Sequence, residues 1–516
     1  MPPRDLNLPF PALLPTLLLG LVVSACAPSP PAPPAPAPEV AEAPLALAVE
    51  SHLTEDLLFE HVAFLASDEM RGRNTPSPEL ERAADYLGER FEAAGLEPAG
   101  DDGSFFQLWP FEHSVLDPDR SVAGFTVDGT QRDWRYGDEY FAIPGPSTSV
   151  EGTPIYAGDP ATVTAGLPQE ANGGIVVISL PEGLDEGFAI SVQAAMMSGA
   201  AAIVLIMSEE TPASDIFQLG AALEAGAAGQ FPIPTIGIRY DIGEEMLQAA
   251  GLGAVGARDP PEILEEVTLS LASVFEPRVD EVRNVVGLVR GADPELAETY
   301  VVLTAHYDHV GVGPPDERGD SIFSGADDNA SGTSALLQIA AAFGELEEPP
   351  ARSVLFLAVS GEEKGLLGSA HFASSPTVPL EGIVANLNMD MVGRSHPDTV
   401  YAIGEEYTTI GEAVRRIASE RPELGLVAAP DPEPEEQAFL RSDHYSFVEQ
   451  GIPALMLTTW LHDDYHLPSD TPDRVDADKL ARVARLGFYL AHELASDPAP
   501  PSWTQEGEEL LQSLPF

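Results

Sequence analysis

The chain has 516 residues, of which 44% are hydrophobic, and 83 acidic against 25 basic residues give a formal net charge of −58. This length exceeds one compact core, so we expect two or three domains, and the hydrophobic content excludes a mainly disordered chain. A field of this sign repels phosphate backbones, which argues against nucleic acid as a partner.

The first 26 residues have the pattern of an export signal. Arg4 precedes the apolar run "LLPTLLLGLVVSAC", which is too short to span a bilayer and ends at Cys26, the only cysteine. "VVSAC" resembles a bacterial lipobox, in which the cysteine becomes the lipidated first residue of the mature protein. We therefore predict a lipoprotein signal peptide over residues 1–26 and a lipid-anchored protein of the bacterial cell envelope. An ordinary secretory signal, which would release the protein, is the alternative.

The next segments change from a spacer to a folded domain. Residues 27–50 are rich in Pro and Ala and predict an extended tether. Residues 51–149 are expected to begin the main domain, because apolar residues recur at helical spacing from Leu80 to Ala94. Ser77 and Pro78 suit the start of this helix and Gly95 its end.

Residues 150–264 differ in composition from the segments around them, with short apolar strands, Ala/Gly-rich helices and no histidine. "GAAAIVLI" followed by "IPTIGI" resembles a protease-associated (PA) domain, which we expect as a smaller insert. Over residues 265–498, apolar strands alternate with amphipathic helices, a pattern that predicts an α/β fold with a sheet sandwiched by helices. Residues 499–516 are expected to be a C-terminal tail.

Polar clusters follow the expected strands of the main domain. They are "HYDH" after "YVVLTA", "GADDNASG" before a helix, "SGEEKG" after "SVLFLAV", "NMDMVG", and "YHLPSDT". Taken singly, each has a structural explanation: a hydrogen-bonded pair, a helix cap or a solvated corner. Taken together at neighbouring strand ends, these anionic and imidazole groups would repel one another without positive charge, and mixed His and carboxylate ligands suit zinc.

The five motifs, in this order, resemble the co-catalytic two-zinc aminopeptidases of metallopeptidase family 28, and "FLASDEMRGR" near the start extends the resemblance. The resemblance implies a mixed β-sheet fold and two Zn²⁺ ions per chain. It makes His306 and Asp390 ligands of one zinc, Glu363 and His466 ligands of the other, and Asp328 a bridge between them.

The same resemblance implies the chemistry. Glu362 would be the general base for a hydroxide that bridges the metals, and Asp308 would lie behind His306 and fix its tautomer. The substrates would be peptides with a free N-terminus. A carboxypeptidase or a glutaminyl cyclase on the same fold stays open, as does a PA-containing, receptor-like binding protein without catalysis. Neither the oligomeric state nor the preferred N-terminal residue follows from the sequence.

Other polar residues near the motifs are weaker candidates. Asp443 and His444 in "RSDHYSF", together with His462, are candidates for the substrate pocket, with structural support as the alternative. Asp327 is expected to be a turn or cap residue. His309, His371 and His492 are assigned no role.

Overall fold

The computed structural model describes residues 42–514, apart from 181–185, 212–216, 218–219, 221–230, 259 and 317. The predicted signal peptide, including Cys26, and residues 27–41 of the predicted tether lie outside the described residues. Residues 42–50 of that tether are helical rather than extended, because α1 (Glu42–His52) buries Leu45, Ala48 and Val49 against the main core. Among the described helices, none is long and apolar enough to cross a membrane.

The described part of the main domain is built on a nine-stranded sheet, in the order β1-β13-β17-β14-β18-β21-β19-β20, with β2 also paired to β13. Strands β17, β14, β18 and β21 run parallel to one another, whereas β13 pairs antiparallel with β17 and β19 pairs antiparallel with β21. The predicted mixed sheet is therefore confirmed. Its strands are β1 (Glu97–Pro98), β2 (Phe106–Leu116), β13 (Phe275–Val289), β14 (Tyr300–His306), β17 (Ser353–Val359), β18 (Ile383–Met389), β19 (Thr399–Ile403), β20 (Val427–Ala429) and β21 (Ala454–Thr458).

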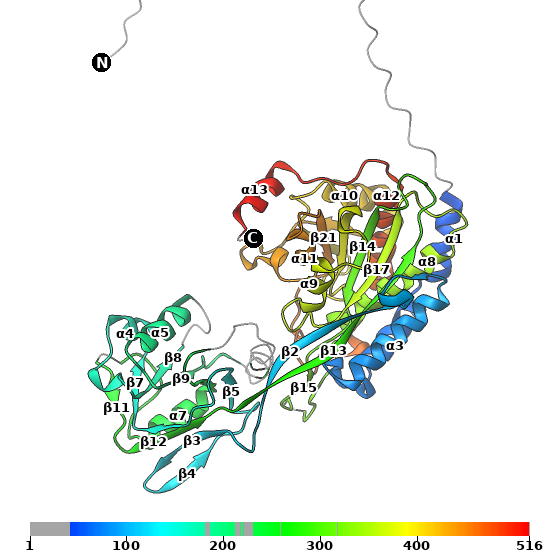
Figure 1. Ribbon diagram of the computed structural model, residues 1–516. Coiled ribbons are helices and arrows are strands. Elements are labelled where there is room, and N and C mark those ends of the chain that lie inside the picture. The colour runs from blue at the N-terminus through cyan, green and yellow to red at the C-terminus, as the bar shows by residue number, and fades with distance from the viewer. Residues whose placement is uncertain are drawn as a thin grey trace, which may run out of the picture. The chain divides into compact units, whose positions relative to one another are not determined.

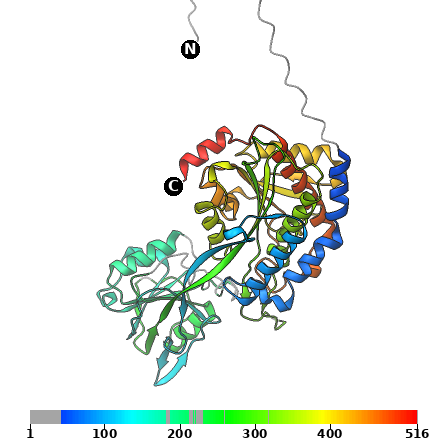
Figure 2. The same cartoon turned by 45° about the vertical axis from the view of Figure 1, so that its right-hand side comes forward.

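Helices cover both faces of this sheet (Figure 1). In β14, Val301 and Leu303 pack into the cluster that also contains residues of α1, α3 and α8, whereas Tyr300 and Val302 pack with residues of α9 and α11 on the other face. Figure 2 shows the two layers still on opposite sides after a 45° turn. The helices are α2 (Glu55–Leu65), α3 (Pro78–Ala93), α8 (Gly332–Gly344), α9 (Leu367–Ser374), α10 (Ile410–Glu420), α11 (His444–Val448), α12 (Ala477–Ser496) and α13 (Gln505–Ser513).

Helix α3 forms as its sequence predicts. The Ser77 hydroxyl accepts a hydrogen bond from the Leu80 N–H (3.0 Å), and Pro78 occupies the first turn, where no intrahelical donor is needed. Gly95 follows the helix in a left-handed conformation with φ 76°. The apolar stripe that the spacing predicts, including Leu80, Leu87 and Phe91, is fully buried in the main core.

Residues 122–272 form a separate lobe with two sheets and its own apolar clusters. Strands β3 and β5 precede residue 150 but pair with β12 and β10, so the predicted boundaries at 150 and 264 fall inside the lobe rather than at its ends. One sheet has the order β11-β7-β8-β9-β10-β5 and the other β4-β3-β12-β6. The elements are β3 (Val122–Val127), β4 (Thr130–Asp133), β5 (Tyr140–Ile143), β6 (Val150–Gly152), β7 (Pro154–Gly158), α4 (Pro160–Ala165), β8 (Ile175–Ser179), α5 (Glu186–Met197), β9 (Ala202–Ile206), β10 (Thr235–Ile238), α7 (Tyr240–Ala249), β11 (Glu262–Ile263) and β12 (Val267–Ala272).

Candidate metal centre

The predicted metal ligands lie at the carboxyl ends of strands of the main sheet. His306 ends β14, Glu363 follows β17 and Asp390 follows β18, and these strands are parallel neighbours. Their ends therefore meet at one edge of the sheet. Asp328 joins them from the short turn Ala326–Ser331 before α8, and His466 from the loop after β21.

The first group of donors consists of His306, Asp328 and Asp390. Nε2 of His306 lies 3.3 Å from Oδ1 of Asp328 and 3.3 Å from Oδ1 of Asp390. The other nitrogen of His306, Nδ1, lies 3.3 Å from the main-chain carbonyl of Asp308. A proton on Nδ1 thus leaves the lone pair of Nε2 facing the two carboxylates, which is the arrangement of a metal-binding histidine.

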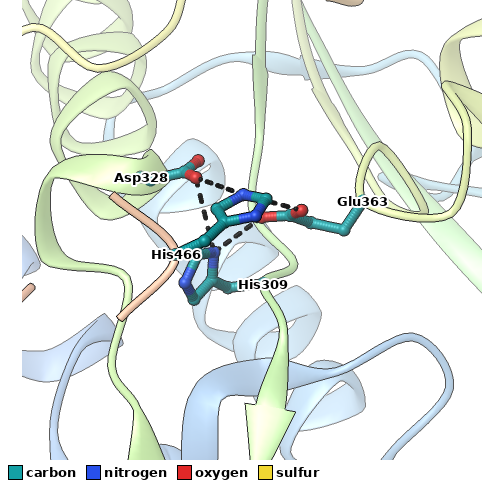
Figure 3. Close-up of side chains that lie close together, drawn as sticks. All are labelled: His309, Asp328, Glu363 and His466. Carbon is teal, nitrogen blue, oxygen red and sulfur yellow. Dashed lines mark hydrogen bonds and ion pairs between the residues drawn. The ribbon is translucent and has the colours of Figure 1, made fainter. Parts of the chain in front are cut away.

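The second group consists of His309, Asp328, Glu363 and His466, whose side chains converge in Figure 3. Nε2 of His466 lies 3.0 Å from Oδ2 of Asp328 and 3.2 Å from Oε2 of Glu363. Nδ1 of His309 lies 2.6 Å from the other oxygen of Glu363, Oε1. Asp328 belongs to both groups, with Oδ1 in the first and Oδ2 in the second.

These distances fit zinc. At zinc–ligand bonds of about 2.0–2.2 Å, the corners of a tetrahedron lie roughly 3.3–3.6 Å apart. The contacts of 3.0–3.3 Å that His306 and His466 make with the carboxylates are close to this spacing. Two imidazoles and three carboxylates, one of them shared, can hold two ions, as the resemblance implies.

Glu362 lies beside these donors but outside the two groups that share Asp328. Burial raises the pKa of its carboxyl well above the usual value; the nearby His306 opposes this rise, and the negative charge of Glu363 adds to it. A buried carboxylate with a raised pKa is a stronger base than a solvated one. Glu362 therefore has the environment of a proton acceptor.

Asp308 differs in detail from its predicted role. Its carboxylate lies 3.9 Å from Nδ1 of His306, which contacts the Asp308 main-chain carbonyl instead. The two carboxylate oxygens accept hydrogen bonds from the Glu362 N–H (3.2 Å) and the Thr75 hydroxyl (2.9 Å). Asp308 thus orients the turn that carries Glu362, while its backbone orients His306.

Two further residues hold the loops of the site: Arg73, the last residue of "FLASDEMRGR", and Asp470, in "YHLPSDT", to which the sequence analysis gave no role of their own. Arg73 is fully buried and donates hydrogen bonds to main-chain carbonyls on both sides of the metal-binding segments, including those of Tyr307 and Gly325. Asp470 accepts hydrogen bonds from the N–H groups of Asp327 and Asp328. Both anchors bind main-chain groups of segments that lie far away in sequence.

A cavity of about 80 Å³ adjoins the donors. It is lined by His306, Asp328, Glu362 and Asp390 and by mainly apolar side chains, namely Met391, Ala438, Met456, Trp460, Leu461 and Tyr465, with Arg441, Ser442 and Thr458. A larger cavity of about 570 Å³ includes none of the metal donors, so size does not mark the site.

The three predicted pocket residues are not among those that line the smaller cavity. Asp443 and His444 are fully buried next to its lining residue Ser442. Burial raises the pKa of Asp443 to about 7 and lowers that of His444, which packs on Phe439, to about 3. Nε2 of His462 lies 3.3 Å from Oδ2 of Asp327. The neighbours of these residues in sequence, rather than the residues themselves, face the cavity, because adjacent side chains point in different directions.

His309 is the residue of the site that the sequence reasoning missed. It is fully buried and belongs to the second donor group, although it was assigned no role. The available signal was its place one residue after Asp308 in "HYDH", which puts it at the same strand exit as His306.

Comparison with known proteins agrees with this geometry. The family model "Peptidase family M28" matches residues 284–491, the segment that carries every donor of both groups. Residues 284–491 form a peptidase family M28 domain. The M28 domain thus contains the sheet edge, both donor groups and Glu362, whereas the lobe over residues 122–272 lies outside the match.

Curated relatives resemble part of the chain. Aminopeptidase YwaD of Bacillus subtilis (strain 168) is 26% identical over 282 residues, which is 52% of this chain and 53% of the relative. The glutamate carboxypeptidase 2 homolog of Caenorhabditis elegans is 27% identical over 316 residues, or 53% of this chain and 39% of the relative. The chain thus spans about half the length, or less, of these curated relatives.

Solved structures show the same fold over most of the chain. BSAP, a zinc aminopeptidase from Bacillus subtilis, superposes with a TM-score of 0.61 at 19% identity, covering 87% of this chain and 97% of that chain. The aminopeptidase from Aneurinibacillus sp. strain AM-1 gives a TM-score of 0.59 at 20% identity, with 88% and 96% covered. At an identity of 19–20%, these structures show that the fold is shared and no more.

Proposed function

We propose that the protein is a zinc-dependent aminopeptidase that holds two zinc ions and removes N-terminal residues from peptides. The observation that carries the proposal is the sharing of Asp328, whose two oxygens face two separate donor groups. His306 and Asp390 complete one group, and Glu363 and His466 are the proposed ligands in the other, which also contains His309. The aminopeptidases among the relatives and solved structures support the proposal.

Zinc held by these groups would supply Lewis acidity, which polarises a peptide carbonyl and lowers the pKa of water. The chain itself provides the proton transfers. Glu362 lines the cavity next to His306 and Asp390, so its carboxylate can take the proton of the attacking water and return it to the leaving amine. The hydrogen bond from the Glu362 N–H to Asp308 keeps the main chain at this residue in place.

The dimensions of the cavity favour an exopeptidase. Its volume of about 80 Å³ is near half of the roughly 150 Å³ of a cavity that admits benzene. This space suits one side chain beyond the reacting carbonyl rather than a further stretch of peptide.

A carboxypeptidase is the second candidate, because Arg441 also lines the cavity. A guanidinium pairs well with a C-terminal carboxylate. Nη1 of Arg441 already lies 3.4 Å from Oε2 of Glu436, however, and both side chains are half-exposed, so solvent screens the charge of Arg441. This contact favours the aminopeptidase.

The deciding experiment compares peptide substrates for the protein that lacks residues 1–26. Free, N-acetylated and C-amidated forms of one peptide are digested, and zinc is counted on the same sample. An aminopeptidase cleaves the free and amidated forms and spares the acetylated form, whereas a carboxypeptidase spares the amidated form. Glu362→Gln should keep about two zincs and lose 10²–10⁴-fold in kcat, and Glu348→Gln at an exposed position serves as the matched control.

The proposal extends to the lobe over residues 122–272, which we assign as the inserted PA domain and expect to shape access of peptides to the cavity. The structure suggests a clean excision, because the Asp117 N–H donates to the Val274 carbonyl (2.8 Å) across the strands that lead into and out of the lobe. Replacing residues 118–273 with a short glycine turn should alter the preferred peptide length. An unchanged length preference would remove this role.

We also propose export through residues 1–26 and lipid anchoring at Cys26, with secretion as the alternative. The support is the apolar run that ends in "VVSAC". A lipid anchor predicts that Cys26→Ser releases the protein from the membrane fraction of an expressing bacterium. Equal recovery of both forms in the soluble fraction would favour secretion.

A further inference from the structure

His309 is the member of the second donor group to which the proposed zinc site gives no role. Its side chain is fully buried, and Nδ1 lies 2.6 Å from Oε1 of Glu363 and 3.7 Å from Oδ2 of Asp328. Its ring stands nearly perpendicular to that of His466, with 5.5 Å between centroids (Figure 3). His309 is therefore either a fourth ligand of the second metal or a partner that orients Glu363.

The ring is held in place from two sides. A Cβ on Gly325 would lie 2.5 Å from the ring atoms of His309, so the ring packs directly on this glycine. The main-chain N–H of His309 donates to the main-chain carbonyl of Arg73 (3.3 Å). The Arg73 guanidinium in turn donates to the main-chain carbonyl of Gly325 (2.9 Å). A side chain fixed in this way can impose a direction on its partner.

The two nitrogens of His309 distinguish the two roles. A metal-binding histidine donates its other N–H to an acceptor, as His306 can do to the Asp308 carbonyl. Nε2 of His309 is buried and has no hydrogen-bond partner among the described residues. If Nδ1 bound a metal, the proton would sit on this unpartnered Nε2, whereas a proton on Nδ1 forms a hydrogen bond with Glu363.

The two oxygens of Glu363 support the same assignment. Oε1 faces His309 at 2.6 Å, and Oε2 faces His466 at 3.2 Å. The contact of 2.6 Å is a hydrogen-bond distance and is shorter than the roughly 3.3–3.6 Å between two ligands of a tetrahedral zinc. Only Oε2 lies at the spacing of a ligand.

We propose that His309 is a positioning residue whose Nδ1–H binds Oε1 of Glu363 and thereby presents Oε2 alone to the metal shared with Asp328 and His466. The inference rests on the proposed two-zinc function. The hydrogen bond also holds the Glu363 side chain in place before the metal binds, so this side chain loses less conformational entropy on binding. His309 thus strengthens zinc binding without touching zinc.

The test compares His309→Ala with His309→Asn, because the amide nitrogen of asparagine can take the place of Nδ1 and donate the same hydrogen bond. His371→Asn, at a partly exposed histidine that stacks on Trp109, is the matched control. Zinc affinity is measured in chelator-buffered solutions, and the visible spectrum of the Co²⁺-substituted protein reports the coordination number. Thermal unfolding of the zinc-free forms checks that each variant folds.

If His309 is a positioning residue, His309→Ala should bind the second zinc 10–100-fold more weakly than the unchanged protein. His309→Asn should recover most of this affinity, and its Co²⁺ spectrum should match that of the unchanged protein. If His309→Asn is as weak as His309→Ala and its spectrum changes, His309 is a ligand and the proposal fails. It also fails if neither variant changes zinc binding. If the unchanged protein binds no zinc, the proposed function itself fails. If His309→Ala does not fold, the zinc affinity and the Co²⁺ spectrum of His309→Asn decide between the two roles.

Discussion

Replacing Arg73 with methionine should destabilise the metal-binding loops. Arg73 is fully buried and donates four hydrogen bonds of 2.9 Å or less, to the carbonyls of Leu65 (2.8 Å), Tyr307 (2.8 Å), Ser324 (2.7 Å) and Gly325 (2.9 Å). Bonds from a charged donor contribute about 1.5–3 kcal/mol each, so four contribute roughly 6–12 kcal/mol. Contributions within one hydrogen-bond network are not additive, so the net effect is smaller than this sum. We expect a net loss of about 3–5 kcal/mol in the free energy of unfolding.

The assay is urea unfolding of the zinc-free protein, with Arg71→Met as the matched control. The Arg71 side chain is 57% exposed, and the ion pair between its Nε and Oε1 of Glu79 is 3.9 Å long, so its loss should cost less than about 0.5 kcal/mol. At an m-value of about 3 kcal/mol per M, Arg73→Met should lower the midpoint by roughly 1–1.7 M. A shift no larger than that of Arg71→Met would refute the reasoning.

Three further predictions concern the metals, the substrate and the cavity. In the metal-free protein, burial lowers the pKa of His306 and of His466, but neighbouring carboxylates outweigh it and raise both pKa values well above 6.5. Zinc must therefore displace these protons, so the affinity of the protein for zinc should keep rising from pH 6 to 8. Calorimetry in two buffers at pH 7 should detect the release of up to about two protons on zinc binding, and the absence of proton release would contradict the reasoning. Peptides that begin with alanine, valine or leucine should be cleaved at least about tenfold faster, in kcat/KM, than those that begin with tryptophan, because the apolar cavity measures about 80 Å³. Met456→Ala should narrow this difference by enlarging the cavity, and an unchanged ratio would show that the N-terminal side chain binds elsewhere.

The sequence by itself determined the strands, the helices and the types of metal donor. Alternation of apolar runs predicts β14, β17 and β18, and a parallel sheet brings whatever follows each strand to one edge. The caps and apolar stripe of α3 are likewise local properties. Short motifs after each strand were therefore enough to place His306, Glu363 and Asp390 together.

The tertiary structure decided how the donors share their atoms. Asp328 divides its oxygens between two groups, His309 reaches Glu363 across 54 positions of sequence, and the Asp308 carboxylate binds the Glu362 N–H rather than His306. The lobe also begins before residue 150, the start that its composition predicts, because β3 and β5 pair with strands more than 90 residues away. Each of these contacts depends on the packing of distant segments and on side-chain rotamers, which local periodicity does not encode.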